Sequence, residues 1–413
     1  KFNNATSRLL GDIYAQWEII PDLKLKVSLG ADVMYHKTNR YTPSNIYQSG
    51  GVASAYVGVN KSINWLNENT LTWNKTFAEE HDLSLLGGFT MQKNNAEYVM
   101  GSSSNFVNDV MLYNNLGAGS VYNKPESNAT QWSLMSYLAR INYTLKHKYL
   151  FSVNARVDGS SRFGTNNKYG FFPSLAAGWR ISEEQFWKEN ENLSFINNLK
   201  LKASYGILGN NNIGNYPYQS VYSLGQEQNY VFGGVYTQGA AVTTYVDPGL
   251  KWERTRTTDV GIETAFFNNK LTFNASYFYR KTTDVLYKPA ASYSSIFGLS
   301  VSQVNTGELE NKGWEFEIGH QNTIGKFHYH INGNFSIIDN KVLTLGMGNV
   351  TQNNGMVGNG SDLFIGYPMQ MFYGYKTDGV FLTDDEVGDW YDQTAIAKGS
   401  KAGDIRYVDI TGD

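Results

Sequence analysis

Apolar and polar residues alternate with a period of two over long stretches of this chain. In the clearest run, 23–35, every second residue is apolar and the intervening residues are mostly charged or small. The same pattern recurs at 149–158, 259–266, 271–280 and 327–337. This period predicts β-strands with one apolar face. We count about twelve such runs, many reaching the roughly 9–11 residues that a tilted strand needs to cross a bilayer.

The connections between these runs alternate between short and long. Short connections are expected at Pro21–Asp22, 78–81, 146–148, 267–270 and 324–326, and long ones at 37–60, 102–130, 158–169, 285–312 and after Ile338. Outer-membrane barrels have short periplasmic turns and long external loops. A soluble sandwich also alternates, with its apolar face inward, but has no reason to keep this asymmetry.

One connection of intermediate length, 182–198, takes the place of a short turn in this order. We expect it to hold a small helix, with Ser182 as the N-cap and Glu184 and Gln185 in the first turn.

The pattern therefore predicts an all-β fold, a large antiparallel transmembrane β-barrel that is incomplete in this chain. In lipid every backbone polar group must be paired, so the sheet must close and its apolar face must meet the acyl chains. The polar face then surrounds a wet lumen or a plug. Six tryptophans are candidates for the aromatic girdles at the membrane interfaces, although each could equally be a single packing residue: Trp65, Trp73, Trp132, Trp179, Trp252 and Trp314.

Composition agrees with this interpretation and excludes other classes. Charged residues are 17%, below the roughly 25% of soluble domains, and aromatic residues are 15%. No apolar run is long enough for a membrane helix. The absence of cysteine rules out a disulfide scaffold and a thiolate metal site. A net charge of -3 without a basic patch makes nucleic acid a poor partner. Residues 1–10 do not form a signal peptide, and we interpret the chain as a fragment.

Several segments resemble the SusC/RagA-type TonB-dependent outer-membrane transporters. The most characteristic is Asp158-Gly159-Ser160-Ser161-Arg162-Phe163-Gly164, within 139–187. Further matching segments follow in the family's order at 199–218, 247–287, 305–318, 366–381 and 403–413. Residues 1–130 agree in pattern only.

This resemblance implies a bacterial outer-membrane importer rather than an enzyme, with residues 1–413 forming part of its barrel domain. A plug fills the barrel of such proteins, and TonB acts on the plug from the periplasm. A SusD-like surface lipoprotein usually caps the barrel, and the substrates are oligosaccharides or, in some members, peptides. We expect the Ton box, the plug and the last barrel strands to lie outside this chain, so the TonB contact cannot be named.

Two groups of residues are candidates for the function of the external side. The motif 158–164 lacks the spacing of a nucleophile elbow, so we interpret it as a structural loop that packs or folds back at the external rim. Tyrosine rings can stack on sugars, which makes one long loop a candidate for ligand binding, with ordinary loop packing or lipoprotein contact as the competing interpretation. Its candidate residues are Asn210, Asn211, Tyr216, Tyr218, Tyr222 and Tyr230.

Metal and catalytic sites are weakly indicated. Residues 409–413 resemble the start of a calcium loop, with Asp409 and Asp413 as candidate ligands, but Thr411 stands where Asp or Asn is expected. A polar turn is the default, and no cofactor besides calcium is expected. The pairs His328/His330 and Glu315/Glu317 each share a strand face but lack companion groups, so lumen lining is favoured.

Three functions remain open from the sequence. The first is an importer of oligosaccharides or peptides. The second is a structural or adhesive barrel whose loops bind surface ligands. The third is an outer-membrane enzyme, which would need a Ser-His-Asp group or paired carboxylates in the external loops, and the sequence offers neither.

Overall fold

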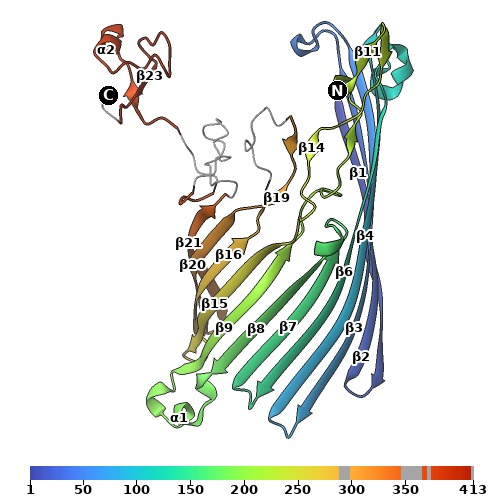
Figure 1. Ribbon diagram of the computed structural model, residues 1–413. Coiled ribbons are helices and arrows are strands. Elements are labelled where there is room, and N and C mark those ends of the chain that lie inside the picture. The colour runs from blue at the N-terminus through green and yellow to red at the C-terminus, as the bar shows by residue number, and fades with distance from the viewer. Residues whose placement is uncertain (288–297, 346–364, 370–373, 411–413) are drawn as a thin grey trace. The chain divides into compact units, whose positions relative to one another are not determined.

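A computed structural model describes residues 1–287, 298–345, 365–369 and 374–410. One large sheet dominates it (Figure 1). In the described residues the sheet contains β1 (Phe2–Ile20), β2 (Leu23–Thr42), β3 (Ser54–Phe77), β4 (His81–Phe106), β5 (Gly119–Tyr122), β6 (Glu126–Leu145), β7 (Tyr149–Ser160), β8 (Tyr169–Arg180), β9 (Ile196–Asn210), β15 (Glu253–Phe266), β16 (Leu271–Thr283), β20 (Glu308–Ile324) and β21 (Phe327–Thr344). Leaving aside β5, which pairs with β4, the path runs through twelve strands, as the alternation predicted.

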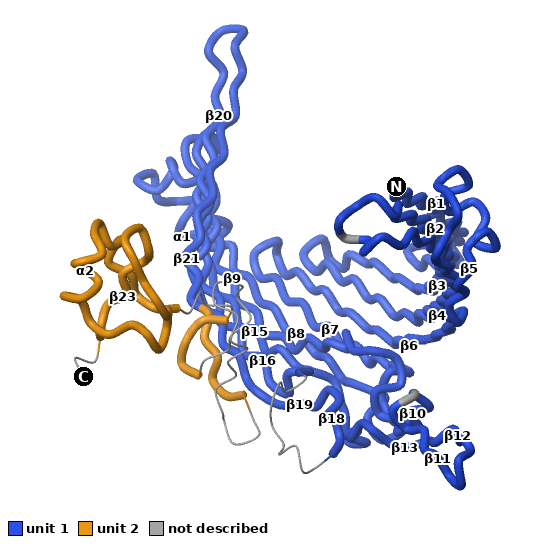
Figure 2. The backbone as a smooth tube through the Cα atoms, turned by 90° about the horizontal axis from the view of Figure 1, so that it is seen from above, with its two compact units in different colours: residues 1–339 blue, residues 340–413 orange. Residues whose placement is uncertain are grey.

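Neighbours in the sheet are also neighbours in the sequence. Every pair from β1 to β20 is antiparallel, and β1 and β21 are the two ends of the path. Viewed from above, the sheet within residues 1–339 follows a curved path, as a barrel wall does (Figure 2). Short turns gather at one edge, the short-turn end, and long connections at the other, the long-loop end (Figure 1). This is the up-and-down topology that the connection lengths predicted.

The register places apolar residues opposite apolar residues on one face. Leu71 lies opposite Leu25, Val153 lies opposite Ile141, and Val260 lies opposite Ala203. Directly opposed residues share a face of the sheet, so this apolar face continues from strand to strand. Asn67 and Asn69 interrupt it, and they offset the cost by hydrogen-bonding to each other at 2.7 Å.

The long connections are shorter than predicted, most clearly the first two. β2 continues to Thr42 and β3 begins at Ser54, so the predicted loop 37–60 is only 43–53. The predicted loop 102–130 begins after Phe106, and β5 and the start of β6 lie within it. The strands extend past the apolar belt, where polar residues such as Lys37 and Lys61 appear on the outward face and weaken the alternation that marks a strand.

Four of the six predicted girdle tryptophans lie on the apolar face, each with an apolar or aromatic residue opposite it on at least one neighbouring strand: Trp65, Trp73, Trp179 and Trp314. The prediction is wrong for the other two. Trp132 lies opposite Asn94 on the polar face, under the guanidinium of Arg162. Trp252 is only 5% exposed and packs among loops. A tryptophan near a strand end has the same sequence context whichever face it occupies, so the sequence could not separate these two.

The intermediate connection contains helical turns, but its cap was predicted wrongly. Ser182 lies inside a 3-10 turn, Ile181–Glu183, and its buried hydroxyl has no hydrogen-bond partner among the described residues. The helix α1 (Gln185–Lys188) begins after Glu184, whose side chain makes no capping bond. A second 3-10 turn, Glu191–Leu193, leads into β9.

Glu184 instead fixes this connection to the ends of β7 and β8. Its carboxylate accepts hydrogen bonds from the Tyr149 hydroxyl at 2.6 Å, Lys148 Nζ at 2.9 Å and Trp179 Nε1 at 3.0 Å. These donors, the Tyr149 hydroxyl first, lower the pKa of Glu184 to about 2. The carboxyl group therefore serves as a charged anchor that joins three sequence segments.

Short elements fill the long connections between the main strands. The connection after β9 holds β10 (Tyr222–Ser223), β11 (Tyr230–Phe232), β12 (Val235–Thr237), β13 (Ala241–Val242) and β14 (Thr244–Tyr245). The connection between β16 and β20 holds β17 (Leu286–Tyr287), β18 (Ser300–Val301) and β19 (Val304–Asn305). β11 and β12 form a hairpin whose turn residues, Gly233 and Gly234, both have positive φ.

Residues 340–413 form a second compact unit. It pairs β22 (Thr377–Val380) with β23 (Ile405–Tyr407) and contains the short helix α2 (Asp384–Gly388). The indole of Trp390 donates to the carbonyl of Tyr407 at 2.7 Å, and the Arg406 guanidinium lies over its ring. Across the described residues, no helix has the length and apolar character needed to cross a membrane.

Replacing Glu184 by Gln removes the charged acceptor, so we expect a lower thermal midpoint for the full-length protein in detergent at pH 7. Because the folded-state pKa is depressed, this stabilisation is present above the unfolded pKa near 4.5 and is lost as pH falls toward about 2. The difference in thermal midpoint between wild type and E184Q should therefore disappear as the pH falls from about 4.5 to about 2. The control Glu191→Gln, on an exposed residue of the same connection, should leave the midpoint unchanged; equal losses in both variants would contradict the role of Glu184.

Val153 lies on the apolar face of β7, midway between Tyr149 and Val157. We expect Val153→Arg to lower the free energy of unfolding in lipid vesicles by about 2–4 kcal/mol, because a guanidinium would enter the hydrocarbon region. Ser152→Arg, one residue earlier on the polar face, should cost clearly less. Reversible denaturant titration of the full-length protein measures both, and a larger loss for the Ser152 variant would reverse the assignment of the faces.

Candidate functional site

The polar face of the sheet is a wall of cross-linked side chains. Arg140 Nε donates to Asn154 Oδ1 at 2.7 Å, and Asn154 Nδ2 donates to Ser174 Oγ at 3.1 Å. Farther along, the Glu263 carboxylate pairs with Lys200 at 3.1 Å and Lys202 at 2.8 Å. These partners on neighbouring strands keep the bonded side chains ordered while they face water.

A concavity of about 530 Å³ lies on this wall. Its lining comes from seven consecutive strands of the sheet, from β6 to β20, and includes Ser152, Lys202, Asp259, Ser276 and Glu315. Glu315 forms no ion pair within the described chain, whereas Glu317 accepts a hydrogen bond from Asn274 at 3.1 Å. The surface therefore offers hydroxyl, ammonium and carboxylate groups to a polar occupant.

A second concavity of about 740 Å³ lies near the long-loop end of β1–β4. Hydroxyl groups dominate its lining, with Arg40 as its one cation. The lining includes Thr38, Arg40, Thr42, Ser49, Ser54, Tyr56, Ser102, Ser103 and Asn123. Such a surface suits hydrogen bonding to a hydrated ligand rather than burial of an apolar one.

The motif 158–164 lies where β7 ends and folds back against its neighbours. Asp158 pairs with Arg156 at 2.6 Å, and Arg156 also reaches the buried Ser136 hydroxyl at 3.0 Å. The ring of Tyr169 on the next strand covers Gly159 so closely that a Cβ there would force the ring to move. These contacts fix the start of the loop to β6, β7 and β8.

The two serines and the arginine of the motif tie separate segments together. Ser161 makes reciprocal bonds with the Ser133 backbone, at 3.0 Å through its N–H and 2.8 Å through its hydroxyl. The Ser160 hydroxyl accepts from Asn211 Nδ2 at 3.0 Å. Arg162 donates to the Asn211 carbonyl at 3.0 Å while stacking over Trp132. The loop after β9 is thereby fixed to the loop after β7.

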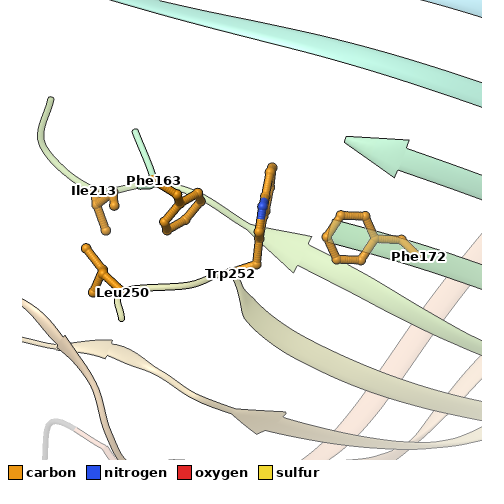
Figure 3. Packing of buried hydrophobic residues seen from close by; sticks show 5 residues of the cluster. All are labelled: Phe163, Phe172, Ile213, Leu250 and Trp252. Atoms are coloured by element: carbon orange, nitrogen blue, oxygen red, sulfur yellow. The ribbon is translucent and has the colours of Figure 1, made fainter. Parts of the chain in front are cut away.

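Phe163 completes this arrangement by entering a buried apolar cluster (Figure 3). The cluster joins Phe163, Phe172, Ile213, Leu250 and Trp252, and the Phe163 and Trp252 rings lie 5.2 Å apart. Trp252 Nε1 donates to the Lys168 carbonyl at 3.0 Å, and Asn167 Nδ2 to the Gly249 carbonyl at 2.8 Å. We call the contacts among 158–169, 210–213 and 249–252 the loop hub.

The candidate ligand residues divide into two groups. Asn211 is part of the loop hub, and Asn210 donates to Glu253 at 3.1 Å. The Tyr218 ring lies against Gly164, and Tyr216 has a positive φ of 59°. Tyr222 and Tyr230 present most of their surface to solvent, at 72% and 65%. The structure does not gather all six candidates at one place.

The sequence did not identify Trp252, Asn167 and Lys168 as members of the loop hub. Their only signal is that they lie in segments that resemble one family, 139–187 and 247–287. Their contacts span about eighty residues of sequence, with Asn167 to Gly249 as an example. A single sequence carries no information on such long-range pairing.

The candidate metal and catalytic groups are spread out. Asp413 lies outside the described residues, so the calcium loop is described only as far as Asp409 and Ile410. His328 Nδ1 is bonded to the Thr323 hydroxyl at 2.8 Å. In the described part of the chain, no group of three or more His, Asp or Glu residues is arranged to hold a metal ion.

Known proteins with this sequence pattern form one family. The family model described as TonB dependent receptor-like, beta-barrel, matches residues 2–413. TonB-dependent receptor P3 of Formosa agariphila is 34% identical over 97% of this chain and 40% of its own length. TonB-dependent receptor SusC of Bacteroides thetaiotaomicron is 31% identical over 81% of this chain and 32% of its own length. The chain thus spans less than half the length of these relatives.

Comparison with solved structures leads to the same family. The RagAB peptide transporter is similar with a TM-score of 0.80 and 25% identity, over 93% of this chain and 41% of that one. The siderophore receptor PiuA of Acinetobacter baumannii, at 12% identity and a TM-score of 0.50 over 89% of this chain and 50% of that one, shares the fold alone. With the period-two strands, the polar wall and the motif 158–164, these matches place the chain in the TonB-dependent receptor β-barrel family, among outer-membrane proteins of the SusC/RagA type.

Proposed function

We propose that the protein to which this chain belongs imports oligosaccharides or peptides across the outer membrane in a TonB-dependent manner. The observation that carries this proposal is the continuous polar wall, because its hydrogen-bonded side chains would line a water-filled path through the membrane. Above it, the loop hub holds two long connections, those after β7 and β9, in fixed positions at the external end. Transport of this kind needs no covalent step in the chain.

The chemistry of the wall supports a hydrophilic substrate. Its concavities present hydroxyl groups with a few charged groups, Lys202, Asp259 and Glu315 among them. Such groups can replace the hydration of sugar hydroxyls or peptide amides. Tyr222 and Tyr230 add exposed rings in the loop after β9, and such rings can stack on a sugar. RagAB, described as a peptide transporter, is one similar protein.

The proposal includes three partners. A plug would occupy the lumen against the polar wall, and TonB would pull on that plug from the periplasm. A SusD-like surface lipoprotein would cover the long-loop end and hold substrate over the opening. The loop hub supports this arrangement, because a cap needs loops that keep one geometry.

Deleting the complete gene should abolish growth on a defined glycan or peptide as the only carbon source, and complementation should restore it. Uptake of the labelled nutrient by whole cells measures transport directly. A complemented strain whose TonB system is inactive should fail to take up the nutrient. Normal growth of the deletion strain on every nutrient, together with lost attachment to a surface ligand, would favour an adhesive barrel instead.

The two exposed tyrosines allow a sharper test of ligand contact. We expect Tyr222→Ala combined with Tyr230→Ala to weaken ligand binding by about 1–3 kcal/mol, the scale of two lost ring contacts, without changing the thermal midpoint. Asn211→Ala, which removes a bond of the loop hub, should instead lower the midpoint or increase proteolysis of the loops. Calorimetric titration and limited proteolysis of the full-length protein measure these effects, and unchanged affinity in the tyrosine variant would exclude the two rings.

A further inference from the structure

The apolar face of β2–β4 continues past Trp65 into a stripe of lysines. Lys93 lies directly opposite Trp65, and Lys61 lies directly opposite Tyr35. Lys37 follows two residues beyond Tyr35 on the same side of β2. Directly opposed residues share a face, so all three lysines point outward, on the side that meets lipid, and not into the lumen.

The position of the stripe coincides with the outer edge of the membrane. Trp73 and Trp65 are eight residues apart on β3, about 26 Å along the strand and about 20 Å in height at a tilt near 40°. Lys61 lies four residues farther, about 30 Å above Trp73 by the same measure. An outer-membrane barrel has an apolar band about 25 Å tall. Lys93 and Lys61 therefore bracket the rim of this band on the long-loop side, where headgroups lie.

The three lysines have no carboxylate partner in the part of the chain that the structure describes. Lys61 Nζ lies 6.0 Å from the centre of the Tyr35 ring. Glu97 faces Lys61 across the strands without pairing to it, which leaves the stripe with a net positive charge. The outward face of β16 and β20 differs, because Lys281 pairs with Glu308 at 2.8 Å and Lys312 with Glu310 at 3.2 Å. The ion-paired lysines of β16 and β20 therefore provide a matched control for the three lysines of β2–β4.

We propose that Lys37, Lys61 and Lys93 form a binding site for a phosphorylated glycolipid of the outer leaflet. Ammonium groups bind phosphate as point charges, and three of them spread along the stripe can meet more than one phosphate. Tyr35 and Trp65 suit the boundary between headgroup and acyl chain. Val33 and Ile63 lie between Lys61 and Trp65, and Leu29 lies below Trp65, so this face also offers an apolar surface to the chains. The site lies outside the lumen, so it goes beyond the import function and does not depend on the substrate.

The test compares three forms of the full-length protein purified from outer membranes in mild detergent. One form is wild type, one carries Lys37→Gln, Lys61→Gln and Lys93→Gln, and one carries the matched changes Lys281→Gln and Lys312→Gln. Bound glycolipid and glycerophospholipid are quantified by mass spectrometry per mole of barrel. We expect the triple variant to retain at least roughly tenfold less glycolipid than wild type, and the matched variant to retain the wild-type amount.

Three outcomes of this comparison would overturn the proposal. The first is equal retention of glycolipid by wild type and the triple variant. The second is an equal loss in the matched variant, which would indicate attraction by charge in general. The third is selective loss of glycerophospholipid from the triple variant. A second variant carries Lys→Arg at the same three positions, preserves the charges and should retain the glycolipid. This variant tests the proposal even if the Gln variant does not fold. Loss of the glycolipid from a folded Arg variant would also contradict the proposal.

Discussion

The pairing of backbone hydrogen bonds across the sheet is the constraint on which the rest of this structure depends. In hydrocarbon an unpaired N–H or C=O group costs several kcal/mol, so a chain that crosses as strands must pair every strand with a neighbour. Antiparallel pairing meets this requirement with the shortest connections between strands. The hydrogen-bonded ladder runs without a break from β1 to β20. The register of each pair then decides which side chains face lipid, because a slip of one residue would exchange the two faces.

Exchanging the two faces would be unfavourable on both sides of the sheet. Lys200, Lys202 and Glu263 would enter lipid, and Leu201, Ile262 and Val260 would enter the wet side. The side-chain bonds of the polar wall favour the same register, since Lys200 and Lys202 reach Glu263 only with this pairing. The hydrophobic effect and the polar network therefore select one arrangement together, which is why the wall stays regular over twelve strands.

Beyond the membrane the constraint is relaxed, and other interactions take over. β2, β3 and β4 are 20, 24 and 26 residues long and extend into water, where both of their faces can be polar. The loops at this end depend on specific contacts, chiefly the loop hub built on Ser160, Arg162 and Phe163. A buried aromatic cluster and a few hydrogen bonds to loop backbone hold three distant segments together. The positions of the connections after β7 and β9 are therefore fixed by the motif and not by the sheet.

The sequence by itself determined the class of fold, the number of long strands, their apolar and polar faces and the order of short and long connections, because all of these follow from local periodicity. It also marked 158–164 as a structural motif through its resemblance to a family. Only the tertiary structure decided where β2 and β3 end, that Trp132 and Trp252 turn away from lipid, that Glu184 anchors the connection in which Ser182 was expected to cap a helix, and which segments meet Arg162 and Phe163. These features depend on contacts between residues tens of positions apart, and a local pattern has no access to them.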